Sequence, residues 1–239
     1  MKNILKRHKF HLSKKDIYTL ACFFYNESGG LLSSAFLYLP LPLKRHCVQV
    51  GTVAGLMAMQ APDWAIPAGM TREEYANAVR YGSLYHDIGA YLVYNQRGMY
   101  PDTGVRFLRE QFAETEISPA AQQIILETVQ SYGERYDGQG YPKKLAGDNI
   151  PLHAGICAIA DEIDCMIVGR HGFFINAAAD AKKYINENKG AAFSPEAAGC
   201  FMTAYADIAG LYHHWRKHPP FWGNDNIKPL DKPIDRPIG

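Results

Sequence analysis

The adjacent pair His86 and Asp87 has the residue types from which proteins build metal centres. It offers one imidazole nitrogen and one carboxylate oxygen to a single ion, a mixed donor set that suits iron, manganese or zinc. His46 and Asp161 lie on other expected elements and could converge with the pair on the same ion. Taken alone, a His-Asp dipeptide is more often a salt bridge at a helix end. The metal chemistry therefore depends on residues far from the pair in sequence.

A glycine-rich segment is the second chemically distinctive feature. Residues 136–142 read YDGQGYP, about fifty positions after the His-Asp pair. The spacing of Gly138 and Gly140 resembles half of a nucleotide-binding loop, but we expect no strand before it and no helix directly after it. A tight turn is the better interpretation, because glycine permits the positive backbone angles that would present Tyr141 and Pro142.

Asp164 and several histidines are weaker candidates. Asp164 lies one helical turn after Asp161, so it could orient a metal ligand or act as a general base. A supporting carboxylate outside the ligand set is the alternative. His153, His171 and the pair 213–214 have no carboxylate or cysteine at ligand spacing, and we expect surface or core histidines there.

Helices must position these residues, because the apolar spacing is helical and no alternating strand pattern longer than four residues occurs. Thr71 and Glu74 form a capping-box signature. It predicts a helix that runs to His86 and Asp87 and stops near Gly89. Other helices are expected over residues 13–29, 44–60, 118–131, 152–168 and 194–214, with a Leu-Pro loop over 39–42.

Length and composition favour one all-α globular domain with appended ends. The chain has 239 residues, of which 47% are hydrophobic and 21% charged, enough to bury a sizeable core. We expect an N-terminal helical extension over residues 1–39, the domain over 40–212, and a proline-rich tail over 213–239 that is extended from about His218.

Charge and cysteine content argue against several classes of function. With 25 basic and 24 acidic residues, the chain has no broad electrostatic reason to bind a nucleic acid polymer or a membrane surface. Its 5 cysteines are odd in number and lie in mostly apolar segments, so we expect reduced, buried thiols rather than disulfides or a zinc knuckle. No apolar run suffices for a membrane helix, and the basic start lacks a signal-peptide core, which together predict a cytoplasmic protein.

The order of the candidate ligands, H…HD…D, resembles the signature of the HD superfamily of metal-dependent phosphohydrolases. The segment from Glu134 to Pro142, the sequence AIAD that ends at Asp161, and Gly190 followed by FSPE at 193–196 are similar to motifs of the HD-GYP subfamily. The resemblance covers roughly residues 40–212 and implies an HD-domain helical bundle. Active members of the subfamily bind two or three iron or manganese ions and hydrolyse cyclic di-GMP.

The chain departs from the subfamily pattern where the second and third metals bind. Pro42 replaces a glutamate ligand, Ala90 replaces a phosphate-binding lysine, and Tyr100 and Tyr132 replace histidine ligands. Part of the usual active-site loop is also missing. The two tyrosines could bind ferric iron as phenolates, or they could fill the vacated space. All four candidates for the common HD metal remain, so the resemblance implies one divalent ion, iron or manganese rather than zinc.

Two functions stay open from the sequence. In the first, the protein is a metal-dependent phosphohydrolase that acts on cyclic di-GMP or another small phosphate ester. Asp87 and Asp164 would act in catalysis, and the metal would be held by His46, His86, Asp87 and Asp161. The resemblance implies that Arg170 contacts the substrate phosphate. In the second, the protein is a catalytically inactive binding or scaffold domain in cyclic-dinucleotide signalling, with a structural metal. A diguanylate cyclase-type partner would then dock on Gly140, Tyr141 and Pro142.

Overall fold

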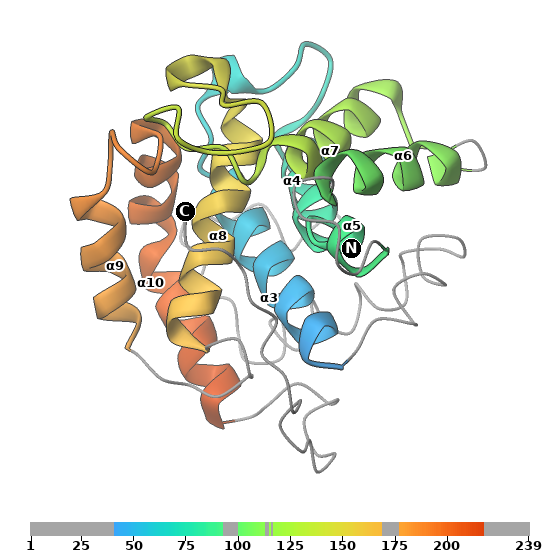
Figure 1. The fold of residues 1–239 in the computed structure, drawn as a ribbon. Coiled ribbons are helices and arrows are strands. Elements are labelled where there is room, and N and C mark those ends of the chain that lie inside the picture. The colour runs from blue at the N-terminus through green and yellow to red at the C-terminus, as the bar shows by residue number, and fades with distance from the viewer. Residues whose placement is uncertain (1–40, 93–99, 113–114, 116, 169–176, 218–239) are drawn as a thin grey trace.

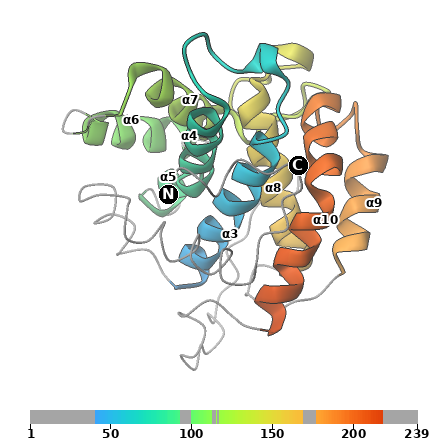
Figure 2. The ribbon, with the colours of Figure 1, turned by 180° about the vertical axis from the view of Figure 1, so that it is seen from behind.

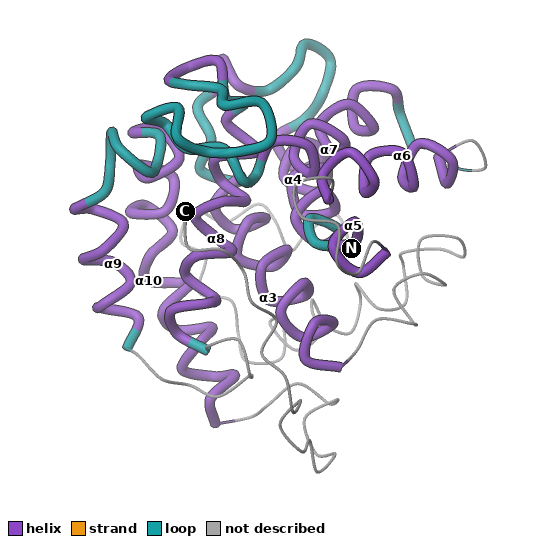
Figure 3. Tube along the Cα trace, viewed as in Figure 1, coloured by secondary structure: helices purple, strands orange, loops and turns teal. Residues whose placement is uncertain are grey.

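A computed structural model describes residues 41–92, 100–112, 115, 117–168 and 177–217. Within these ranges every named element is helical, and the only pairing of strand type is an isolated bridge between Lys189 and Phe193. Figure 3 shows these helices and the loops that join them. The predicted all-α class is therefore confirmed.

The described helices span most of the region predicted to be the domain. The α-helices are α3 (Leu41–Ala58), α4 (Arg72–Leu84), α5 (Ile88–Leu92), α6 (Tyr100–Phe112), α7 (Pro119–Ser131), α8 (Leu152–Ile167), α9 (Ala178–Glu187) and α10 (Pro195–Lys217). Two short 3-10 helices are η1 (Asp63–Ala65) and η2 (Gly147–Asn149). None of the described helices combines the length and apolarity that a bilayer crossing needs.

Helix α8 lies at the centre of the bundle. It packs against α3, α4, α7, α9 and α10. Figures 1 and 2 show α9 and α10 on one side of α8, and α4, α6 and α7 on the other. Ile156, Ile159 and Ile163 recur at helical spacing along α8 and are fully buried, as their spacing predicts. Side chains of α8 can therefore reach residues from both halves of the molecule.

Helix α4 ends earlier than its sequence pattern predicts. We expect it to run to His86 and Asp87, but it ends at Leu84. Tyr85 leaves the helical conformation with φ −105° and ψ 9°, and its N–H bonds to the carbonyl oxygens of Tyr81 and Gly82. The buried Tyr85 ring anchors this end of the helix in the core. The His-Asp pair consequently lies in a turn between α4 and α5.

Gly89 lies inside α5, although the sequence predicts a helix stop there. A Cβ atom at this position would collide with the carbonyl oxygen of Tyr100, at the start of α6. The glycine therefore permits the close approach of α5 and α6 rather than ending a helix.

Two predicted starts are confirmed. The Thr71 side chain accepts a hydrogen bond from Glu74 N, and Thr71 N donates to Glu74 Oε2 over 2.8 Å, which completes the capping box. The Ser118 side chain accepts from Ala121 N, and α7 then runs to Ser131 as predicted.

Other helix ends differ from the predictions. Leu41 and Pro42 belong to the first turn of α3 rather than to a loop, because proline lacks only an N–H that has no helical partner there. Helix α10 passes the predicted end near His214 and reaches Lys217, since Tyr212 and Trp215 remain buried along it. Helices α6 and α9 have no counterpart among the predicted helices. The expected helix over 13–29 and the tail from 218 lie outside the described residues.

Within the described residues, the cysteines agree with the sequence prediction except at one position. None of the four within the described residues forms a disulfide. Cys47, Cys157 and Cys200 are buried, and burial raises the pKa of Cys200 to about 11. Cys165 is only partly buried, contrary to the expectation of a core thiol.

Candidate metal centre

The turn between α4 and α5 fixes the His-Asp pair in a buried position. His86 and Asp87 are 2% and 3% exposed. His86 Nδ1 lies 2.7 Å from the carbonyl oxygen of Ser83, which can only accept a hydrogen bond, so Nδ1 is the protonated ring nitrogen. Nε2 is then the nitrogen that carries a lone pair, which is the form of histidine that binds metals.

Three segments bring four candidate ligand atoms to one place. His46 Nε2, from α3, lies 3.1 Å from Asp161 Oδ1 of α8 and 3.9 Å from Asp87 Oδ2. His86 Nε2 lies 3.5 Å from Asp87 Oδ2 and 3.8 Å from Asp161 Oδ1. Atoms bound at roughly 2.0–2.2 Å to one ion stand about 3–4 Å apart. The observed spacing therefore fits a single shared cation.

His46 is held by Asp164, whose two oxygens have separate partners. Asp164 Oδ2 lies 2.8 Å from His46 Nδ1, and Asp164 Oδ1 accepts from the Tyr212 hydroxyl over 2.9 Å. Burial and the Asp164 charge hold the pKa of Tyr212 well above its usual value, so the phenol stays a donor. Asp164 is 2% exposed and faces away from His46 Nε2. This geometry favours the orienting role of Asp164 over that of a general base.

The protonation of His46 shows the electrostatic character of the cluster. Burial alone would lower the pKa of this imidazole, but the carboxylates of Asp161 and Asp164 outweigh burial and raise it from 6.5 to about 10. His46 Nε2 is buried and, among the described residues, has no hydrogen-bond partner of suitable geometry. In the metal-free protein, the buried carboxylates therefore keep the His46 ring protonated and positively charged. A metal cation bound at the same place can replace that proton.

Tyr132 occupies the position of a histidine ligand in the HD-GYP pattern, and it contacts the metal cluster from outside. Its hydroxyl donates to Asp87 Oδ1 over 2.8 Å, and its ring meets His86 edge-on at 4.9 Å between centroids. The hydroxyl thus holds the Asp87 oxygen that does not face the two histidines. These contacts favour the space-filling interpretation of Tyr132 over ligation of iron as a phenolate.

Cys165 adds a donor that sequence reasoning missed. It lies one turn after Asp161 on α8, and its Sγ is 3.5 Å from Asp161 Oδ1. His46, Asp161 and Cys165 offer donor atoms within 4.8 Å of one another, and so do His46, His86 and Asp87. The spacing of four residues from Asp161 was the available signal, but the apolar surroundings favoured a core thiol.

The glycine-rich segment forms the predicted turn. Gly138 has a φ of +77°, and Tyr141 is 44% exposed. A Cβ on Gly140 would collide with the backbone of Glu134 and Arg135. The buried Glu134 carboxylate accepts from the backbone N–H groups of residues 143 and 145, over 2.7 and 3.0 Å. The turn therefore has a fixed base and an exposed tyrosine, while its role in docking stays a prediction.

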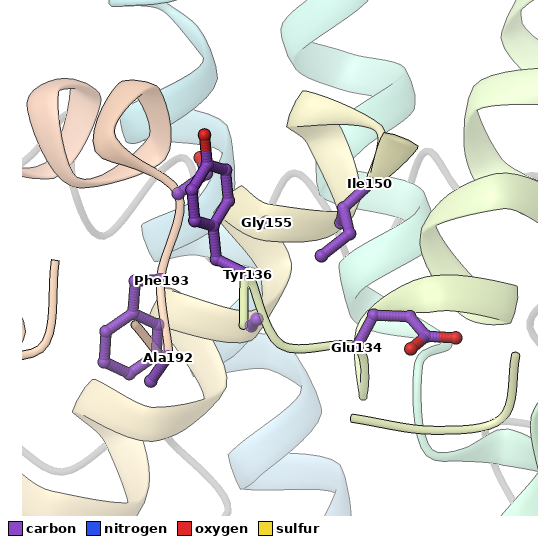
Figure 4. Close-up of a pocket in the computed structure, with 8 residues that line it drawn as sticks. Glu134, Tyr136, Ile150, Gly155, Ala192 and Phe193 are labelled. Carbon is purple, nitrogen blue, oxygen red and sulfur yellow. The ribbon is translucent and has the colours of Figure 1, made fainter. Parts of the chain in front are cut away.

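A small pocket lies next to the turn, apart from the candidate ligands. Figure 4 shows Tyr136 and Phe193 on one side of it and Ile150 on another. Glu134 also lines it. None of the four metal-ligand candidates is among its lining residues. Because the Glu134 carboxylate is already used by the turn, this pocket shows no chemistry of its own.

Of the remaining predicted site residues, some lie within the described residues and some lie outside them. His153 Nε2 lies 3.0 Å from Glu127 Oε2, so it is a paired and partly buried histidine, as expected. Arg170 and His171 lie outside the described residues. The assignment of Arg170 to substrate phosphate stays a prediction.

Comparison with known proteins gives a match over the centre of the chain. A family model described as an HD domain matches residues 72–196. A cyclic di-GMP phosphodiesterase of Thermotoga maritima is 24% identical over 220 residues, which cover 87% of this chain and 57% of that protein. A probable cyclic di-GMP phosphodiesterase of Vibrio cholerae is 36% identical over 89 residues, 36% of this chain and 20% of that protein. The chain therefore spans 57% or less of the length of these two relatives. His46 precedes the matched family span, and only the fold brings it to the His-Asp pair.

Proposed function

The chain belongs to the HD domain family, and on this basis we propose that it is a metal-dependent phosphohydrolase of HD-GYP type. The observation that carries the proposal is the convergence of His46, His86, Asp87 and Asp161, with donor atoms 3.1–3.9 Å apart. The substrate is cyclic di-GMP or another small phosphate ester. Support for this substrate class comes from the names of the two relatives, one a cyclic di-GMP phosphodiesterase and the other a probable cyclic di-GMP phosphodiesterase.

The proposed cofactor is one divalent ion, iron or manganese. When bound, such an ion supplies Lewis-acid polarisation of a phosphoryl oxygen and an activated water. The chain contributes a preorganised cradle. Ser83 and Asp164 orient the two imidazoles, and Tyr132 orients Asp87. Tyr132 also fills space where the HD-GYP pattern has a histidine, which favours a single ion.

A second candidate function is a catalytically inactive binding or scaffold domain. The exposed Tyr141 ring favours it, because the turn that presents this ring is anchored by the buried Glu134. Ala90 favours it as well, since the HD-GYP pattern has a phosphate-binding lysine at this position. The partner would be a diguanylate cyclase-type protein, and the metal would then link helices without turnover.

Hydrolysis separates the two candidates. Anaerobically purified protein is incubated with cyclic di-GMP and either manganese or ferrous iron, and products are resolved by chromatography. We expect metal-dependent turnover that His86→Ala abolishes. His153→Ala is the matched control, because His153 pairs with Glu127 rather than with the cluster, and this variant should keep its activity.

A protein that shows no hydrolysis would also separate the two candidate functions. A protein that binds one equivalent of metal but hydrolyses neither cyclic di-GMP nor other phosphate esters would exclude the phosphohydrolase. The scaffold function would then be tested by measuring binding of a diguanylate cyclase domain to the wild type and to Tyr141→Ala.

A further inference from the structure

Cys165 lies at the most accessible part of the metal centre. The His86 and Asp87 side chains are 0% and 4% exposed, whereas those of His46 and Asp161 are 16% and 14% exposed. Cys165 is itself partly buried and lies beside this more exposed pair. An ion that enters the centre would therefore meet the thiol together with the two more accessible ligands.

The distances around Cys165 suit direct coordination. A thiolate binds zinc at about 2.3 Å and a carboxylate oxygen at about 2.0–2.2 Å, so two such donors on one ion stand roughly 3–4 Å apart. The Sγ atom lies 3.5 Å from Asp161 Oδ1, inside that range. The same thiol falls within 4.8 Å of the donor atom of His46.

His46 links the thiol to the His-Asp pair. It belongs both to the group with Asp161 and Cys165 and to the group with His86 and Asp87. Its Nε2 atom is buried, and among the described side chains it finds no hydrogen bond of its own. A histidine shared by both groups is consistent with one ion that takes nitrogen, oxygen and sulfur ligands together.

We propose that Cys165 is a thiolate ligand of the metal, so that the centre prefers a thiophilic divalent cation (Fe²⁺, Co²⁺ or Zn²⁺) over Mn²⁺. Sulfur ligands favour these softer ions, whereas carboxylates alone suit Mn²⁺. On binding, the thiol proton passes to solvent and the sulfur lone pair forms the metal bond. The inference rests on the metal centre of the proposed function, but it does not require turnover.

Cobalt substitution tests the proposal directly. The protein is loaded anaerobically with Co²⁺ and its absorption spectrum is recorded. We expect visible ligand-field bands and, in the near ultraviolet, a thiolate-to-cobalt charge-transfer band. Cys165→Ser should lose the charge-transfer band and keep the ligand-field bands. Cys200→Ser is the matched control, because Cys200 is a buried thiol that contacts the carbonyl oxygen of Gln60, so it should keep both.

A competition experiment gives a second readout. Mn²⁺ displaces Co²⁺ less readily from a centre that has a sulfur ligand, so Cys165→Ser should lower the ratio of Co²⁺ to Mn²⁺ affinity. An unchanged ratio contradicts the proposal.

Two negative results of the cobalt experiment would have different meanings. Wild-type protein that shows ligand-field bands without the charge-transfer band overturns the role of Cys165 and leaves the four-residue centre intact. Wild-type protein that binds no more cobalt than His86→Ala overturns both the thiolate ligand and the metal centre.

Discussion

Three of the candidate metal ligands form a hydrogen bond through the side-chain atom that is not their candidate metal-binding atom. Ser83 holds His86, Asp164 holds His46, and Tyr132 holds Asp87. Partners of this kind fix the direction of a ligand and tune its basicity, and their loss typically weakens metal binding by about 10–100-fold. Tyr132 is informative because it replaces a histidine ligand of the HD-GYP pattern and yet still serves the common metal site.

Tyr132→Phe is expected to weaken metal binding by about tenfold or more, because Asp87 Oδ1 loses its donor. Isothermal titration with Co²⁺ or Mn²⁺ measures this directly. Tyr136→Phe is the matched control, since its hydroxyl bonds to Asp148 outside the cluster. Equal losses of affinity in the two variants would contradict a supporting role for Tyr132.

The raised pKa of His46 predicts how the stability of the metal-free protein depends on pH. In the folded state this pKa is about 10, against 6.5 for an unperturbed histidine, so folding favours the protonated ring. The stabilisation is fully present below pH 6.5 and is lost as pH rises toward about 10. Urea unfolding of the metal-free wild type and of His46→Gln should show a stability difference that shrinks over this window. A difference that grows with pH would refute the charge assignment.

Among the elements, the junction of α4 and α5 decides whether the His-Asp pair can bind a metal. Had α4 continued past Leu84, the two side chains would follow helical directions about 100° apart. The turn at Tyr85 instead points both toward α3 and α8. The close contact of Gly89 with Tyr100 then fixes where α5 lies relative to α6.

Gly89→Ala should destabilise the fold by about 1–3 kcal/mol, because the added methyl group meets the rigid backbone of α6. Gly199→Ala is the matched substitution in α10, where a Cβ meets no atom within 4 Å. It should stabilise the protein by up to about 1 kcal/mol, because alanine is the better helix former. Chemical denaturation of both variants measures the two effects, and effects of the same sign would contradict the packing argument.

Across the whole molecule, the centre joins segments that are far apart in sequence. His46 comes from α3, the His-Asp pair follows α4, and Asp161 belongs to α8, the helix that packs against both halves of the bundle. A cation shared by these segments would bind the folded state and not the unfolded chain. Metal binding should therefore be coupled to stability.

Metal is expected to raise the melting temperature of the wild type. At a concentration of about 100 times the dissociation constant, binding to the folded state alone contributes about 2.7 kcal/mol. A thermal melt with and without added metal measures the shift. His86→Ala should show no shift and His153→Ala should show the full one. If added metal leaves the melting temperature of the wild type unchanged, the proposed metal centre is contradicted.

Local sequence determined much of the framework. The capping box at Thr71, the proline start at Pro119 and the isoleucine spacing of α8 depend on neighbours within one or two helical turns, so each was predicted. The turn at Gly138 was predictable for the same reason, because a positive φ favours glycine at that position whatever surrounds it. The four candidate ligands were found because their order along the chain is itself a pattern.

Tertiary structure alone decided how those ligands are held. The hydrogen bond from Tyr132 to Asp87 spans 45 positions, and that from Tyr212 to Asp164 spans 48. The approach of Cys165 to His46 and the end of α4 at Tyr85 likewise follow from how helices pack. Such contacts join side chains that have no fixed spacing in sequence. These contacts depend on how the helices pack, because a buried polar group needs a hydrogen-bond partner and the packing determines which group is near enough to provide it.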